Sequence, residues 1–163
     1  MSDPILMELV GIRIEVPSHT PILLLKEEDG DRYLPIWIGA NEATAIAVAK
    51  DGIEPQRPMT HDLLRTIVEE LGATLDRVVV TELDSGTFYA DLVLNRDGEQ
   101  MTISSRPSDA IALATRLESP VFASPEVLDE AGVELRDAGQ EEEIERFREF
   151  LDDINPEDFG ATQ

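Results

Sequence analysis

The strongest constraint on the fold of this chain is an order of segments that occurs twice. In each half, three short segments rich in apolar residues are separated by turn sequences, and a helical segment follows the third. The expected strands span residues 6–16, 21–26 and 32–38 in the first half, and 77–83, 87–94 and 100–105 in the second. Tight turns such as Asp84-Ser85-Gly86 join neighbouring segments, which favours antiparallel pairing.

Helical segments complete this order. One is expected from Gly39 or Asn41 to about Lys50, where Gly52 stops it, a second from Thr60 to Leu71, and a third from Ser108. A short strand at residues 120–123 and a short helix from Pro125 follow. The order βββα-α-βββα predicts a single α+β domain with one or more mostly antiparallel sheets. Whether the halves are internal repeats stays open, because few residues are identical between them.

The length and the charge bound the possible functions. The 163 residues suffice for one well-buried core, and 35 acidic against 13 basic residues give a net charge of −22. Such a charge repels nucleic acid at long range, so a nucleic-acid function would need a local basic site or bridging metal ions. The alternative is that the charge only aids solubility.

The composition changes near residue 136. Residues 136–163 hold ten acidic and three basic side chains, so we expect a domain at 1–135 followed by an acidic tail at 136–163. Within residues 140–154, apolar residues recur at helical spacing and predict an amphipathic helix. We expect this helix to pack on its own domain or on a sister subunit, or else to bind a separate protein partner. The residues from Pro156 on are expected to be disordered.

Several classes of protein are excluded or disfavoured. No stretch is apolar and long enough to span a bilayer, and the N-terminus lacks the pattern of an export signal, so no membrane association is expected and the cytoplasm is the default compartment. Cysteine is absent, which excludes disulfides, a thiol nucleophile and a thiolate metal site.

Two of the helix starts share one construction. Arg57-Pro58 precedes Thr60-His61-Asp62, and Arg106-Pro107 precedes Ser108-Asp109. Thr60 and Ser108 are the expected N-caps, and Asp62 and Asp109 fall in the first turn, where a carboxylate suits the helix dipole. Each start therefore combines an arginine, a hydroxyl, a carboxylate and free backbone N–H groups. It is either a well-capped helix terminus or half of an anion site.

These helix starts supply the candidate catalytic and binding groups. His61 could accept a proton or contact a phosphate, or it could simply bond to nearby backbone. Arg57 and Arg106 suit a bidentate grip on phosphate, with Thr60 and Ser108 beside them, although ion pairs to neighbouring carboxylates are an equal alternative.

A third helix start contributes Glu42. If Glu42, Asp62 and Asp109 converge, their carboxylates would bind Mg²⁺ or Mn²⁺, the usual ions for phosphodiester cleavage. The alternative is that each carboxylate only stabilises its own helix. Of the aromatic residues, Trp37 is expected to be a core or interface anchor rather than a base-stacking platform, and one of Phe88 and Tyr89 should face outward.

Four ordered blocks resemble the bifunctional nuclease (BFN) domain family. The blocks lie between residues 5 and 133: Leu34-Pro35-Ile36-Trp37-Ile38-Gly39 with Glu42-Ala43, Arg57-Pro58-Met59-Thr60-His61-Asp62-Leu63-Leu64, Gly86-Thr87-Phe88-Tyr89-Ala90, and Arg106-Pro107-Ser108-Asp109-Ala110-Ile111-Ala112-Leu113-Ala114. The resemblance implies a compact α+β domain, a homo-oligomer with a dimer as first expectation, and cleavage of both DNA and RNA. Many relatives carry an acidic residue where this chain has Ser104.

Two principal function hypotheses follow. In the first, the protein is a metal-assisted nuclease in which Glu42, Asp62 and Asp109 hold the cation and His61 acts as base or phosphate ligand, while Arg57 and Arg106 steady the scissile phosphate. In the second, it is a non-catalytic regulatory or protein-binding module whose Arg-Pro corners are structural. A third possibility is that the acidic surface mimics nucleic acid and occupies a DNA-binding protein.

Overall fold

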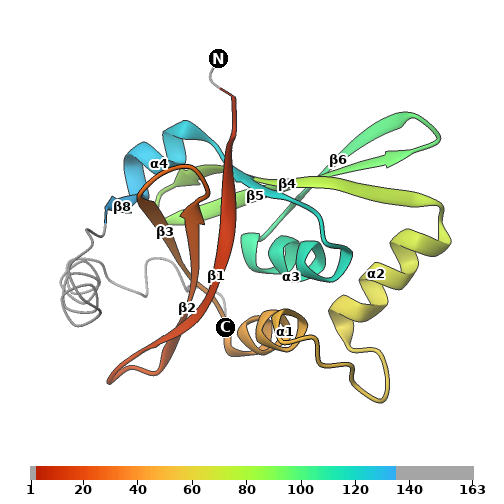
Figure 1. Ribbon diagram of the computed structural model, residues 1–163, viewed down its shortest axis with the longest axis horizontal. Helices are drawn as coiled ribbons and strands as arrows, with labels where there is room; N and C mark the ends of the chain where they lie inside the picture. Colours follow the sequence, from red (N-terminus) through yellow and green to blue (C-terminus); the bar gives the residue numbers. More distant parts are fainter. Residues whose placement is uncertain (1–2, 135–163) are drawn as a thin grey trace.

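The structure, a computed structural model, describes residues 3–134 (Figure 1). Two three-stranded meanders account for most of it. The first is β1 (Ile5–Glu15), β2 (Thr20–Glu27) and β3 (Arg32–Trp37), and the second is β4 (Ala73–Asp84), β5 (Thr87–Arg96) and β6 (Glu99–Ser105). Helices α1 (Ala40–Lys50) and α2 (Thr60–Glu70) connect the two meanders. The second meander leads into α3 (Pro107–Leu117), β7 (Val121–Ala123), α4 (Pro125–Ala131) and β8 (Val133–Glu134).

Within residues 3–134, one eight-stranded sheet, in the order β6-β5-β4-β7-β1-β2-β3-β8, unites the two meanders. Strand β7 joins them, because it pairs antiparallel with β1 and parallel with β4. The other neighbours in the sheet of residues 3–134 pair antiparallel. The expected single α+β domain with a mostly antiparallel sheet is therefore confirmed.

The core lies between the sheet and the helices α1 and α3. Leu23 and Leu25 of β2, Val78 and Val80 of β4 and Ile111 of α3 are all fully buried. Helix α1 contacts β1, β2 and α3, whereas α3 contacts β4 and β5. In the view of Figure 1, α1, α2 and α3 lie below β4 and β5 and to the right of β1 and β2. This arrangement brings the N-termini of three helices to one side of the molecule.

Most strand ends differ from the expected bounds by one or two residues, and two larger differences stand out. Strand β4 begins at Ala73, before the expected start at Arg77, because the register shifts between Leu75 and Arg77 and interrupts the alternation of the sequence. Strand β8 was not expected, since its two residues are too few to produce a pattern.

The expected N-caps of two helices were wrong. Met59 rather than Thr60 caps α2, and Arg106 rather than Ser108 caps α3. In α2, the Asp62 carboxylate accepts a hydrogen bond from the Met59 N–H at 3.0 Å, so the helix terminus does not need the Thr60 hydroxyl. In α3, Pro107 occupies the first helical position, which its fixed φ and missing N–H suit well. Asp62 and Asp109 lie in the first turns, as expected.

The aromatic residues lie largely as expected. Trp37 is buried in the domain, which fits the expected anchor and does not leave its ring free for stacking on a base. Phe88 points into the core, and Tyr89 is exposed on the opposite face of β5. The amphipathic helix expected over residues 140–154 lies outside the described residues.

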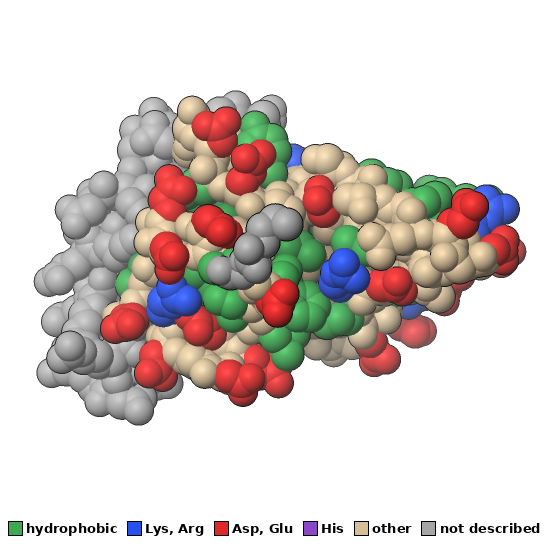
Figure 2. Space-filling view, turned by 90° about the horizontal axis from the view of Figure 1, so that it is seen from above, with side chains coloured by type: hydrophobic (Ala, Val, Ile, Leu, Met, Phe, Trp, Pro, Cys, Tyr) green, Lys and Arg blue, Asp and Glu red, His purple; other side chains and the backbone are tan. Residues whose placement is uncertain are grey.

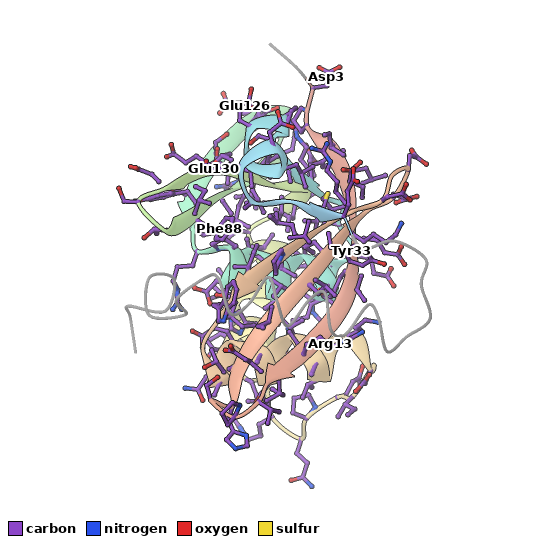
Figure 3. The ribbon with its side chains drawn as sticks, turned by 90° about the vertical axis from the view of Figure 1, so that its left-hand side faces the viewer. Asp3, Arg13, Tyr33, Phe88, Glu126 and Glu130 are labelled. Carbon is purple, nitrogen blue, oxygen red and sulfur yellow. The ribbon has the colours of Figure 1, made fainter. Side chains whose placement is uncertain are left out.

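The described surface is acidic. On the face shown in Figure 2, acidic side chains are spread over the surface with few basic ones among them. Asp3, Glu126 and Glu130 lie toward one end of the molecule in Figure 3. None of the helices in residues 3–134 has the length and apolar character needed to cross a membrane.

Candidate functional site

Four side chains from three helix N-termini form a continuous chain of contacts. Glu42 Oε1 lies 3.0 Å from Arg106 Nη1, and Arg106 Nε donates to Asp109 Oδ2 at 2.9 Å. The other oxygen of Asp109, Oδ1, lies 2.9 Å from His61 Nε2. We call Glu42, His61, Arg106 and Asp109 the helix-terminus network. Of the sequence-predicted residues, these four are brought together.

The local sequence explains how each group reaches this place. Strand β6 ends at Ser105, and Arg106 keeps an extended conformation (φ −72°, ψ 143°) before Pro107 starts α3. Asp109 is then one turn further on, close enough for a bond to Arg106. At α1, Gly39 is the N-cap, and an added Cβ there would lie 3.2 Å from Glu42 Oε1. Glycine at this position therefore leaves room for the Glu42 carboxylate.

The network is graded from buried to exposed. The His61 side chain is only 9% exposed, whereas the Arg106 side chain is 55% exposed. Glu42 and Asp109 are partly buried between them. The pKa of Arg106 is raised, chiefly by its hydrogen bond to Asp109 and further by Glu42, against the opposing effect of burial. Arg106 is therefore the most exposed charged group of the network, with Asp109 next at 30%.

A second ion pair lies beside the network. Arg116 Nε donates to Asp62 Oδ1 at 2.7 Å, and its Nη1 donates to the Ala112 carbonyl oxygen at 2.9 Å. The Arg116 side chain is 4% exposed. Burial would raise the pKa of Asp62, but the hydrogen bonds from Arg116 and the Met59 N–H, with the charge of Arg116, together lower it. This pair fixes the first turn of α2, which carries His61, against α3.

Arg116 was not singled out from the sequence. Its signal was present, because Arg116 follows Asp109 by seven residues and therefore projects from the same side of α3, two turns further on. It is also the basic residue in the last turn of a helix rich in alanine and leucine. An arginine that is buried in such a helix needs a carboxylate partner.

Three other predicted residues lie apart from the network. Arg57 is exposed in the loop before α2, and within residues 3–134 its side chain makes no ion pair or hydrogen bond. Thr60 is exposed at the start of α2, and Ser108 is buried in α3. Neither the Thr60 nor the Ser108 side chain takes part in the described contacts of the network.

The carboxylates expected to hold a cation are engaged with arginines. Both Asp109 oxygens have protein partners, one Asp62 oxygen bonds Arg116 and the other bonds a backbone N–H. Among residues 3–134, no group of three or more His, Asp or Glu side chains is arranged to hold a metal ion. The predicted carboxylates therefore do not form a ready cation site, and binding of Mg²⁺ or Mn²⁺ stays a prediction.

The arrangement can support proton transfer and anion binding. A carboxylate bonded to Nε2 orients the imidazole and favours the tautomer whose Nδ1 lone pair is free. Arg106 offers a permanently charged, planar group next to it. Such a combination suits a reaction in which a proton leaves an attacking water molecule and negative charge builds up on a phosphate.

Comparisons with known proteins agree with these features. The family model described as the bifunctional nuclease domain matches residues 23–136. An uncharacterized protein of Mycobacterium tuberculosis (strain H37Rv) is 47% identical over 164 residues, covering 96% of this chain and 98% of that protein.

Two plant proteins are more distant. Bifunctional nuclease 1 of Oryza sativa subsp. indica is 27% identical over 131 residues, and Bifunctional nuclease 2 of Arabidopsis thaliana is 26% identical over 131 residues. The alignments cover 78% and 77% of this chain but only 39% and 40% of the two plant proteins. The family match covers the whole helix-terminus network. The chain belongs to the bifunctional nuclease domain family.

Proposed function

We propose that this protein is a nuclease that hydrolyses phosphodiester bonds of DNA or RNA at the helix-terminus network. The observation that carries the proposal is the contact of His61 with Asp109, which also binds the exposed Arg106. The plant relatives named as bifunctional nucleases support the reaction class.

Each residue of the helix-terminus network has its own role in the proposed reaction. Arg106 binds the non-bridging oxygens of the scissile phosphate and stabilises the charge that develops there. His61 accepts a proton at Nδ1 from the attacking water, whose oxygen forms the new bond to phosphorus. The bond from phosphorus to the leaving oxygen breaks, and that oxygen takes a proton from solvent. Asp109 holds the imidazole in the required tautomer, and Glu42 positions the guanidinium of Arg106.

Arg57 belongs to the proposed substrate path. It lies in the loop before α2, exposed and free of ion pairs within the described residues, so its charge is available to a second phosphate. Binding there would offset part of the repulsion that a chain of net charge −22 exerts on nucleic acid.

Mg²⁺ and Mn²⁺ are the first cations to test for an effect on the proposed cleavage. A bound divalent cation would lower the repulsion between the acidic protein and a phosphodiester and polarise the phosphate. The carboxylates of Glu42 and Asp109 are bonded to Arg106 and His61, so the proposed proton transfer and phosphate binding use protein side chains alone.

A non-catalytic module of the same fold is the competing proposal. It is favoured by the pairing of every charged member of the network, and by the burial of His61. In that case the contacts serve to join α1, α2 and α3, and the protein acts by binding a partner, for which residues 140–154 are the candidate segment.

A cleavage assay separates the two proposals. The full chain is incubated with single-stranded DNA, double-stranded DNA and RNA, in EDTA and in a titration of Mg²⁺ and of Mn²⁺. Under the nuclease proposal, cleavage is lost in His61→Asn and Asp109→Asn. The chain contains two histidines, so His19→Asn is the matched control; His19 is exposed in a turn with φ 59°, a conformation that asparagine tolerates.

The outcomes are distinct. Cleavage retained in His19→Asn and lost in the two network variants, with all three still folded by circular dichroism, supports the nuclease. Cleavage that survives equally in all variants assigns the activity to another place or to a contaminant. No cleavage by the unmodified chain on any substrate or ion supports the non-catalytic module.

A further inference from the structure

Among residues 3–134, strand β6 presents a free edge. It is the terminal strand of the sheet, and all of its residues, Glu99–Ser105, pair with β5 in a continuous register without a bulge. Sheet edges in proteins usually carry a bulge, a proline or a charge in mid-strand, because an unprotected edge can pair with another chain. Between Gln100 and Ser105, β6 has none of these. Its outer backbone groups are thus available to a further strand.

The hairpin geometry indicates which backbone groups face outward. Asp97 and Gly98 both have positive φ (52° and 84°) and form the two-residue turn between Arg96 and Glu99. In such a hairpin the residues that flank the turn are a hydrogen-bonded pair, and the ladder alternates from there. The N–H and C=O groups of Gln100, Thr102 and Ser104 therefore point away from β5, toward the free edge.

The side chains of β6 add an apolar strip to this edge. Met101 pairs with Leu94 and Ile103 with Leu92, so Met101 and Ile103 lie on the sheet face that carries the core. Both are nevertheless exposed; Ile103 retains 51% of its surface. Within the part of the chain that the structure describes, helix α3 packs mainly on β4 and β5 rather than on β6. The apolar face of the sheet therefore continues past its helical cover onto the edge strand.

The charge distribution favours a particular partner. In a chain of net charge −22, two copies repel each other over most of their surface. Strand β6 is uncharged from Gln100 to Ser105, so two copies can meet there without placing carboxylates opposite one another. A basic partner protein would find no acidic side chain on these residues to bind. The strip is complementary to itself.

We infer that β6 is a self-association surface, where a second copy adds its own β6 antiparallel across a two-fold axis at Thr102. In this register Gln100 lies opposite Ser104 of the other copy, and Met101 lies opposite Ile103. The two eight-stranded sheets become one continuous sheet. The inference concerns an interface and holds whether or not the protein is a nuclease.

Sedimentation velocity on the full chain over a range of concentrations is the first test. The unmodified chain is expected to reach twice its 18.0 kDa mass. Ile103→Lys places one lysine from each copy at the β6–β6 interface. The repulsion between these like charges should raise the dimer dissociation constant by about 100-fold or more. The matched control is Ile14→Lys on β1, because Ile14 is 53% exposed but β1 is separated from β6 in the sheet by β5, β4 and β7.

A cross-linking test follows the register directly. The chain has no cysteine, so Thr102→Cys introduces a single thiol that meets its own copy at the two-fold axis. A short bis-maleimide should then give a covalent dimer, whereas Thr66→Cys on the exposed side of α2 should not. A monomer at all concentrations, a dimer that Ile103→Lys leaves intact but Ile14→Lys disrupts, or cross-linking only through position 66 would each overturn the inference.

Discussion

His61 Nε2 and Asp109 Oδ1 lie 2.9 Å apart although 48 positions separate them in the sequence. The contact joins the first turn of α2 to the first turn of α3. Asp109 reaches Arg106 with its other oxygen, so one carboxylate links a buried imidazole to an exposed guanidinium. The same bonds can orient catalytic groups and hold three helices together. Stability and cleavage therefore have to be measured on the same variants.

Asp109→Asn is expected to affect both properties. Asparagine keeps the shape but loses the charge that holds Arg106 and His61, so we expect a loss of about 1–2 kcal/mol in the free energy of unfolding. If His61 is the general base, the cleavage rate should fall about 100-fold or more. Urea denaturation and initial rates on one substrate measure the two effects. Asp97→Asn in the exposed β5–β6 turn is the control and should change neither.

Arg116→Met tests the buried ion pair. It removes the partner of Asp62 while keeping the length of the side chain, and an uncompensated carboxylate in this place should cost about 3 kcal/mol of unfolding free energy. The control is Arg65→Met, since Arg65 and Glu69 lie 3.7 Å apart on the surface and such pairs contribute about 0.5 kcal/mol or less. Adding Asp62→Asn to Arg116→Met should recover part of the loss. Equal effects of the two arginine substitutions would contradict this assignment.

The same pair predicts a dependence of stability on pH. The pKa of Asp62 in the folded protein is lowered from its ordinary value of 3.8, so the unfolded chain binds the proton more readily. The contribution of the pair is therefore complete above pH 3.8 and is lost as the pH falls through the folded-state pKa.

Comparison with Asp62→Asn isolates this contribution. The difference in unfolding free energy between the unmodified chain and Asp62→Asn should be constant from pH 7 to about pH 5 and shrink below pH 3.8, as the pH falls through the lowered folded-state pKa of Asp62. Urea denaturation at low protein concentration measures it, because the sequence pI of 4.2 lowers solubility in this range. A difference that grows on acidification would show that Asp62 is not stabilised in its charged form.

Much of the fold could be predicted from the sequence because its signals are local. The alternation of residues in β1 and the turn at Asp84-Ser85-Gly86 depend only on neighbouring residues. The position of β7 between β4 and β1 could not be predicted in this way, since it depends on pairing between strands far apart in the chain. The start of β4 was missed because a bulge interrupts its alternation.

In the candidate site, too, local features could be predicted from the sequence and long-range contacts could not. The sequence identified Glu42, His61, Arg106 and Asp109 as separate helix-start residues, but only the packing of α1 and α2 on α3 brings them into contact. Arg57 has the same Arg-Pro context as Arg106, but within residues 3–134 only Arg106 forms ion pairs with Glu42 and Asp109. Asp62 pairs with Arg116, which lies in the last turn of α3 and not at the start of a helix. Which arginine meets which carboxylate is set by helix packing, and a repeated motif does not fix it.

The last prediction compares how much the hydroxyls of Thr60 and Ser124 contribute to the stability of the helix starts of α2 and α4. Thr60 was expected to cap α2, but Met59 is the N-cap and the Asp62 carboxylate bonds its N–H, so Thr60→Ala should change the unfolding free energy by about 0.5 kcal/mol or less. Ser124 does cap α4: its hydroxyl oxygen accepts from the Val127 N–H at 3.3 Å and its O–H donates to the Thr81 carbonyl at 3.0 Å. Ser124→Ala removes both bonds and should cost about 1–2 kcal/mol. Thermal and urea unfolding of the two alanine variants measure the contrast, and a larger loss for Thr60→Ala would mean that its hydroxyl, after all, stabilises the start of α2.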